Sequence, residues 1–282
     1  MHIYEKRRDI VSHVATLLKE QKTIGFVPTM GALHKGHMAL VEKALKENDT
    51  VIVSVFVNPT QFNNSEDLIN YPRTLESDVA LLSKLSTNIV VFAPVPKEVY
   101  GAQMISTNYD FEGLENEMEG KFRPGHFDGV GTVLKRLFEI VSPTRAYFGE
   151  KDFQQLQIVK KLVELEKMSV QIIGCPIFRE ENGLALSSRN KRLNRKQLEA
   201  SPLIYKTLKQ VKKDFGIKSV IELNEWVSEQ FKNNEILELE YFEIAKISDL
   251  KSIKEKQQDT KYRAFIAAFA GKIRLIDNIA LN

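Results

Sequence analysis

Short apolar runs rich in β-branched residues alternate with amphipathic stretches of helical spacing through the first 175 residues of this chain. The apolar runs predict strands at residues 23–27, 50–57, 89–92, 145–148 and 170–173, and the amphipathic stretches predict helices at 36–47, 75–85, 130–141 and 152–167. The run at 50–57 is almost continuously apolar, as is typical of a strand buried on both faces. Because repeated βα units form a parallel sheet with crossover helices, we predict an α/β fold with a Rossmann-like parallel sheet.

The last third of the chain has a different composition. Twelve of the 14 glycines and all five histidines precede residue 190, so we expect the polar chemistry in the N-terminal part. Helices are predicted at 196–215 and 219–233, and strands at 239–244, 263–269 and 272–279. Helices followed by antiparallel strands indicate a smaller α+β domain. We therefore expect two domains, 1–176 and 177–282.

Charge and cysteine content exclude several classes of protein. The chain has 40 Lys and Arg against 37 Asp and Glu, a net charge of +3, which is too balanced for a dedicated nucleic-acid binder. A single cysteine, Cys175, excludes an internal disulfide framework and an all-cysteine metal site. The first 21 residues lack the apolar core of a signal peptide, and no apolar stretch is long enough to span a bilayer. We expect a cytoplasmic protein with no nucleic-acid or membrane partner.

The most informative segment is residues 27–37, VPTMGALHKGH. A predicted strand ends here, the chain turns through glycine, and His34 and His37 lie three residues apart at a helix start. A helix start offers unpaired N–H groups and the positive end of the helix dipole, and both attract phosphate. Two other interpretations exist: helix-capping histidines, or a zinc site, for which no third ligand or HExxH pattern is present.

This segment resembles the HxGH motif of the nucleotidylyl-transferring α/β superfamily, which includes class I aminoacyl-tRNA synthetases and cytidylyltransferases. The longer string PTMGALHKGH, residues 28–37, is similar to that of the pantothenate synthetase (pantoate–β-alanine ligase) family. Five later strings agree with the same family in order: VNPTQF at 57–62, YPRT at 71–74, RPGHFDGV at 123–130, FGEKDFQQ at 148–155 and GLALSSRN at 183–190. Six ordered matches over most of the chain make the resemblance specific.

The resemblance implies a reaction and its substrates. Members of this family join pantoate to β-alanine through an enzyme-bound pantoyl adenylate, consuming ATP and releasing AMP and diphosphate. The ionised pantoate carboxylate needs no general base to attack phosphorus, so the demand is for positioning and charge stabilisation. Mg²⁺ is expected on the phosphate oxygens with few protein ligands, and no protein metal ligand is predicted. The resemblance also implies a homodimer, an N-terminal domain that binds ATP and pantoate, and a C-terminal lid.

Site residues follow from the resemblance position by position. The catalytic role falls on His37, with His34 and Lys151 supplying donors and positive charge. Residues implied in pantoate binding are Gln61, Gln155 and Asn58. Residues implied in ATP binding are Met30, Gly31, Ala32, Leu33, His34, Lys35, Gly36, His37, Gly149, Glu150, Lys151, Asp152, Phe178, Leu186, Ser187, Ser188 and Arg189.

The chain departs from the family pattern at two positions. Ser77 precedes Asp78 where some members carry an acidic pair, which places a carboxylate pair around Mg²⁺ in doubt. Phe178 stands where a smaller residue is common, so the adenosine pocket is expected to differ in shape. The string Lys167-Met168-Ser169 imitates the start of a KMSKS loop, but it ends a predicted helix and is not assigned to the site.

Two other functions stay open at this point. A nucleotidylyltransferase would stop at a nucleotide-linked product. A tRNA- or RNA-binding relative would have lost catalysis, although the near-neutral charge and the lack of a basic aromatic cluster argue against it. Without the family strings, Gln61 is a loop amide, Gln155 a solvated helix residue, and 149–152 an exposed charged turn.

Overall fold

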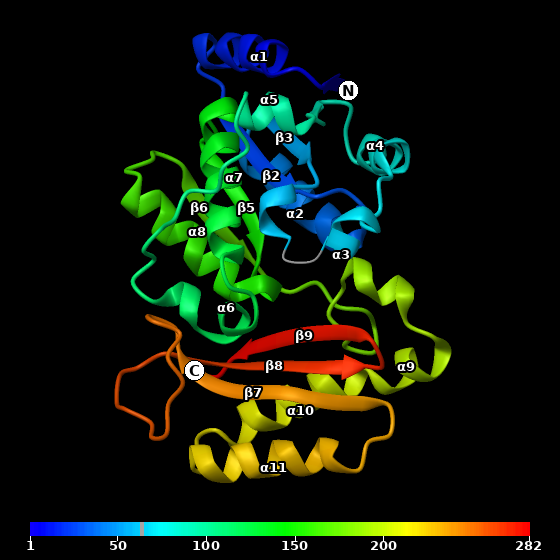
Figure 1. The fold of residues 1–282 in the computed structure, drawn as a ribbon, viewed down its shortest axis with the longest axis vertical. Coiled ribbons are helices and arrows are strands. Elements are labelled where there is room, and N and C mark those ends of the chain that lie inside the picture. The colour runs from blue at the N-terminus through cyan, green and yellow to red at the C-terminus, as the bar shows by residue number, and fades with distance from the viewer. Residues whose placement is uncertain (63–64) are drawn as a thin grey trace. The chain divides into compact units, whose positions relative to one another are not determined.

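The computed structural model describes residues 1–62 and 65–282, and they form two compact units. The first unit contains Met1–Glu150 and Gln154–Pro176, and the second contains Lys151–Phe153 and Ile177–Asn282. Residues 151–153 thus group with the second unit, although they precede the boundary expected near residue 176. Figure 1 shows both units and labels many of their helices and strands.

The first unit is built on a six-stranded parallel sheet, which confirms the predicted parallel sheet and adds one strand to the five expected. In chain order its strands are β1 (His2–Tyr4), β2 (Ile24–Thr29), β3 (Thr50–Val55), β4 (Ile89–Phe92), β5 (Arg145–Gly149) and β6 (Gln171–Cys175). Across the sheet the order is β1-β4-β3-β2-β5-β6. The strand order reverses between β2 and β5, and ligands of open α/β sheets bind beyond the carboxyl ends of strands at such a point.

Helices connect the strands of this sheet. The longer ones are α1 (Arg7–Lys19), α2 (Lys35–Glu47), α4 (Leu75–Ser83), α7 (His126–Val141) and α8 (Phe153–Leu165), whose first residue falls in the second unit. The short ones are η1 (Pro59–Gln61), α3 (Ser65–Ile69), α5 (Pro96–Tyr100), η2 (Leu114–Asn116), α6 (Met118–Phe122) and η3 (Glu150–Asp152). β1 and α1 lie outside the predicted elements, although Ile10, Val14 and Leu17 bury one face of α1 at helical spacing.

Side-chain alternation along β2 explains how the sheet packs on both faces. Val27 belongs to a fully buried cluster with Val41 and Ala44 of α2, whereas the Phe26 ring meets Phe138 of α7 edge-on with 6.1 Å between centroids. Cys175 at the end of β6 is buried, and this burial raises the pKa of its thiol to about 11. The thiol therefore stays protonated near neutral pH and acts as a small apolar side chain.

The second unit is the predicted α+β domain. It contains η4 (Ser188–Arg192), α9 (Arg195–Ala200), α10 (Pro202–Asp214), α11 (Val220–Lys232) and an antiparallel sheet of β7 (Leu237–Lys246), β8 (Tyr262–Ala270) and β9 (Ile273–Ala280). The single helix expected at 196–215 is divided, because Pro202 has no N–H to continue α9 and instead starts α10. Helices α10 and α11 pack on the sheet through one apolar cluster (Figure 1). Over the described residues, no helix has the length and apolar content needed to cross a membrane.

Candidate active site

The loop between β2 and α2 has an unusual backbone that the surrounding side chains hold in place. Gly31 and Ala32 both have positive φ, at +84° and +52°. A left-handed backbone is costly for alanine, so other contacts must fix it. The Thr29 hydroxyl accepts from Gly31 N at 3.1 Å and donates to the Ser54 carbonyl at 2.7 Å.

Asp78 of α4 supplies the rest of this support. Its carboxylate accepts from Ala32 N at 3.0 Å, from Leu33 N at 2.7 Å and from the Thr74 hydroxyl at 3.2 Å. The residue is only 1% exposed. Asp78 therefore orders the loop backbone. Ser77 does not contact the loop in this way, because its hydroxyl donates to the Thr74 carbonyl on the exposed side of α4.

His34 and His37 close the first turn of α2. His34 is the N-cap, and its Nδ1 accepts from Gly36 N at 3.1 Å. The Nδ1 of His37 accepts from His34 N at 3.3 Å, and the two ring centroids lie 4.0 Å apart. Because Nδ1 is the acceptor in both rings, a neutral ring carries its proton on Nε2. Both histidines thus combine the capping role with the donor chemistry expected for phosphate.

Substituting His34 separates these two roles. His34→Ala should cost about 1 kcal/mol of stability through loss of the cap. His34→Asn should restore the cap, because asparagine is a good N-cap residue. The shorter asparagine side chain does not place a donor where Nε2 of His34 lies. We expect both variants to form acyl adenylate more slowly than wild type, measured by substrate-dependent ATP–pyrophosphate exchange. Full activity in His34→Asn would mean that His34 serves only as a cap.

The segment after β3 forms a rigid support for Gln61. Asn58, only 1% exposed, donates from Nδ2 to Gln61 Oε1 at 3.1 Å and to the Gly129 carbonyl at 3.3 Å. Its Oδ1 accepts from the hydroxyls of Thr60 and Tyr100. In the structure these hydrogen bonds hold η1 and orient Gln61, and the substrate contact expected of Asn58 stays a prediction.

Two residues of α7 hold the same segment from the other side. His126 Nδ1 lies 2.9 Å from the Gln61 carbonyl oxygen. At Gly129, a Cβ atom would lie 2.3 Å from the Thr60 carbonyl oxygen, so only glycine allows this approach of α7 to η1. The 123–130 string therefore supports the Gln61 loop. Gln61 Nε2 in turn donates to Met30 Sδ at 3.1 Å, which joins the two loops of the first unit.

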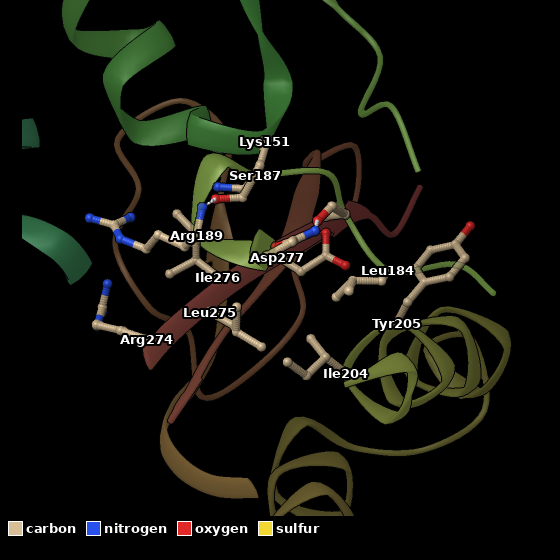
Figure 2. A pocket seen from close by; sticks show the side chains of 12 residues that line it. Lys151, Leu184, Ser187, Arg189, Ile204, Tyr205, Arg274, Leu275, Ile276 and Asp277 are labelled. Atoms are coloured by element: carbon tan, nitrogen blue, oxygen red, sulfur yellow. Dashed lines mark hydrogen bonds between the residues drawn. The ribbon is translucent and has the colours of Figure 1, made fainter. Parts of the chain in front are cut away.

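The second unit carries the remaining predicted residues, and three of them, Lys151, Ser187 and Arg189, line a pocket within it. Its lining includes Lys151, Ser187, Arg189, Asn190 and Asp277, and Figure 2 shows Lys151, Ser187 and Arg189 on one side of it. The Lys151 ammonium lies 3.6 Å from its neighbour Asp152, and the lysine side chain is 16% exposed. Cationic side chains and a hydroxyl are the groups that donate to phosphate oxygens, and this chemistry of the lining agrees with the predicted role of these residues.

A short hairpin presents Leu186, Ser187, Ser188 and Arg189. Leu186 N donates to the Phe178 carbonyl at 3.0 Å, and Glu180 N donates to the Leu184 carbonyl at 2.9 Å. Ser187 then caps η4, its hydroxyl accepting from Arg189 N at 3.2 Å. The Phe178 carbonyl thus accepts a hydrogen bond within the hairpin. The residue itself is 40% exposed.

The structure places the predicted residues in two sets. Residues 30–37, Asn58 and Gln61 are brought together in the first unit, which also contains Gly149, Glu150 and the half-buried Gln155 of α8. Lys151, Asp152, Phe178 and 186–189 belong to the second. Beside Gln155, the buried Gln154 amide accepts from Glu119 N at 3.0 Å and donates to the Leu114 and Glu117 carbonyls at 2.8 and 2.7 Å.

The supporting residues Asp78, Gln154 and Asp277 are missing from the sequence-based site. The available signal is a carboxylate beside apolar residues: Ala80, Leu81 and Leu82 follow Asp78, and Ile276 and Ile279 flank Asp277. A carboxylate in such a setting is either exposed or paired, and only the fold shows which.

A parallel sheet with an HxGH loop after a central strand agrees with the resemblance to the nucleotidylyl-transferring α/β proteins. The chain belongs to the pantoate-beta-alanine ligase family, whose family model matches residues 2–280. It is 54% identical to the pantothenate synthetase of Flavobacterium psychrophilum over 282 residues, covering all of both chains. The corresponding protein of Christiangramia forsetii is 53% identical, again over the whole of both chains.

Solved structures agree with this assignment. The pantothenate synthetase of Thermus thermophilus has 38% identity and a TM-score of 0.89, with 100% of this chain and 99% of that chain covered. A pantoate-beta-alanine ligase from Francisella tularensis, described as complexed with beta-gamma ATP and beta-alanine, has 38% identity and a TM-score of 0.81, with 100% and 98% covered.

Proposed function

We propose that this protein is a pantothenate synthetase that activates pantoate with ATP and transfers the pantoyl group to β-alanine. The observation that carries the proposal is the loop at 30–37, where Asp78 fixes the backbone and the Nδ1 atoms of His34 and His37 accept backbone hydrogen bonds at the N-terminus of α2. ATP and β-alanine are the ligands named for the Francisella tularensis relative.

In the first step the pantoate carboxylate oxygen attacks the α-phosphorus of ATP. A bond forms between that oxygen and phosphorus, the bond to the β-phosphate bridging oxygen breaks, and diphosphate leaves. No proton is transferred, so the protein needs only to align the reactants and stabilise the charge on the phosphates. In the first unit, His34 and His37 are the donors proposed for this charge. In the second unit, Lys151, Ser187 and Arg189 are the cationic and hydroxyl groups that the family resemblance assigns to ATP.

In the second step the neutral amine of β-alanine attacks the pantoyl carbonyl carbon. The new C–N bond forms as the C–O bond to AMP breaks, and the amine proton passes to solvent. The His37 Nδ1 already accepts a backbone hydrogen bond, so its Nε2–H is a donor. We assign it to stabilising the charge on the carbonyl or phosphate oxygen, and this differs from a role as proton acceptor.

Mg²⁺ enters as part of the substrate MgATP. Within residues 1–62 and 65–282, no group of three or more His, Cys, Asp or Glu side chains could enclose a metal ion. Asp78 uses both carboxylate oxygens on backbone amides. Phosphate oxygens and water are the ligands that Mg²⁺ accepts when few protein ligands are offered.

The decisive experiment is pantoate-dependent ATP–pyrophosphate exchange, first without and then with β-alanine. Exchange with pantoate alone, followed by equimolar AMP and pantothenate after β-alanine is added, would establish the two-step ligase. Absence of both exchange and AMP would refute the proposal. Release of a stable nucleotide-linked product would instead indicate a nucleotidylyltransferase.

Gln61 is proposed to bind pantoate, because its amide is held in place by Asn58 and Met30 and can both donate and accept. Gln61→Ala should raise the pantoate concentration needed for half-maximal exchange about fivefold, as expected for about 1 kcal/mol of lost hydrogen bonding. Gln171→Ala, at an exposed glutamine of the same unit, is the matched control. Unaltered pantoate saturation in Gln61→Ala would remove Gln61 from the site.

We also propose a homodimer and a cytoplasmic location, both supported by the family resemblance. Equilibrium sedimentation at several protein concentrations measures the first. A single species at the mass of one 32.3 kDa chain would contradict it.

A further inference from the structure

Two consecutive residues of β9, Asp277 and Asn278, contact both phosphate-directed segments of the second unit. Both are buried, at 4% and 2% exposure. Asn278 reaches the turn that bears Lys151, and Asp277 reaches the hairpin that leads to Ser187 and Arg189. The two segments are far apart in the sequence.

Asn278 fixes the Lys151 turn through its backbone. Its Nδ2 donates to the Lys151 carbonyl at 2.9 Å, and its Oδ1 accepts from the Arg263 guanidinium. Arg263 is 6% exposed, and its guanidinium lies 3.9 Å from the ring centroid of Phe153, two residues after Lys151. The turn is therefore held by a hydrogen bond at Lys151 and by a cation–π contact at Phe153.

Asp277 fixes the hairpin through Arg179. The two side chains form a bidentate pair at 2.6 and 2.8 Å, and the Arg179 guanidinium lies 3.6 Å from the ring centroid of Tyr205. Arg179 also donates to the Gly183 carbonyl at 3.1 Å, at a residue whose φ is +94°. A buried, bidentate pair of this kind has a defined geometry, so it sets the path of the hairpin that ends at Ser187.

The two anchors are also linked to each other. Asn278 N donates to Asp277 Oδ1 at 2.7 Å, the same oxygen that accepts from Arg179. Asp277, Lys151 and Ser187 all line the pocket shown in Figure 2. Moving either residue would thus change the spacing between the lysine and the serine loop.

We propose that Asp277 and Asn278 are positioning residues that set Lys151 and the 187–189 loop at the spacing required to hold the phosphates of ATP during adenylation. This inference rests on the proposed function. Neither residue is assigned a contact with substrate. Their effect is on adenylation, because that step transfers charge among the phosphates, whereas transfer of a preformed pantoyl group to β-alanine leaves no diphosphate to hold.

The test uses three variants of the full chain. Asn278→Leu removes both side-chain hydrogen bonds. Asn278→Asp keeps the acceptor for Arg263 and loses the donor to the Lys151 carbonyl. Asp277→Asn loses the charge that pairs with Arg179. Asn282→Ala is the matched control, because Asn282 likewise donates from Nδ2 to a backbone carbonyl, that of Thr260, at 2.7 Å in the same unit.

Two half-reactions are measured for each protein: pantoate-dependent ATP–pyrophosphate exchange, and pantothenate formation from synthetic pantoyl adenylate with β-alanine. We expect the three variants to lose about tenfold or more in the maximal exchange rate, as for a misplaced catalytic group. Pantothenate formation from the adenylate should stay within about twofold of wild type. An equal loss of both half-reactions would show a general loss of the fold and no specific effect on adenylation, and this outcome would overturn the inference.

Other outcomes also decide the matter. If Asn278→Asp regains full exchange while Asn278→Leu does not, Asn278 serves only to pair Arg263, and the inference is overturned. If the wild type is active and all three variants exchange at the wild-type rate, the inference is overturned and the proposed function stands. A wild type that shows neither half-reaction refutes the proposed function itself, and the inference with it.

Discussion

Replacing Lys151 by alanine is expected to lower the maximal rate of pantoate-dependent ATP–pyrophosphate exchange by about 10²- to 10³-fold. The Lys151 ammonium lies in the pocket with Ser187 and Arg189, and its carbonyl is fixed by Asn278. Because the protein already holds this cation in position, little reorganisation is needed when charge develops on the phosphates. A mobile cation from solvent does not have this advantage. The pantoate concentration for half-maximal exchange should change little.

Two further variants sharpen this prediction. Lys272→Ala removes an exposed lysine of the same unit and should leave exchange unchanged. Lys151→Arg keeps the charge but replaces a compact ammonium by a planar guanidinium, so we expect only partial activity. If Lys151→Ala exchanged at the wild-type rate, the assignment of Lys151 to the phosphates would be wrong.

The large features of the fold are predictable because they follow from local patterns. The β-branched runs of β2 and β3 and the helical spacing of α2 are visible in the sequence, and each persists in the structure. Their parallel pairing follows from the alternation of strand and helix. β1 could not be found in this way, since three residues at a sheet edge carry no usable period.

The functional loops were found from motifs, but the residues that hold them were not. Asn58 shows the limit most clearly. Its place in the VNPTQF string predicts a substrate contact, which stays a prediction, but the string does not show that Asn58 also bonds to Tyr100 and to Gly129 of α7. Whether a polar side chain faces substrate or supports its neighbour depends on elements far away in the sequence, which neither a motif nor periodicity contains.

The same reasoning applies to Asp78, the residue whose loss should most damage the first unit. Asp78→Ala removes three hydrogen bonds and leaves Ala32 N and Leu33 N without their buried acceptor. Bonds to a buried carboxylate are among the stronger ones, so we expect the free energy of unfolding to fall by about 3 kcal/mol or more. Urea denaturation followed by circular dichroism measures this loss.

Asp78→Ala should also weaken ATP binding before the protein unfolds. Without the carboxylate, the left-handed backbone at Ala32, where φ is +52°, loses its direct hydrogen bonds at Ala32 N and Leu33 N and keeps only the support of Thr29 at Gly31. Hydrogen–deuterium exchange of a peptide spanning residues 30–37 should therefore accelerate in native buffer, together with a rise in the ATP concentration for half-maximal exchange. Ser77→Ala, one residue away on the exposed side of α4, should alter stability by about 0.5 kcal/mol at most and leave both readouts unchanged. Slow deuterium uptake in Asp78→Ala would show that the loop holds its own conformation. Asp78 would then not be needed to order the backbone at residues 30–37.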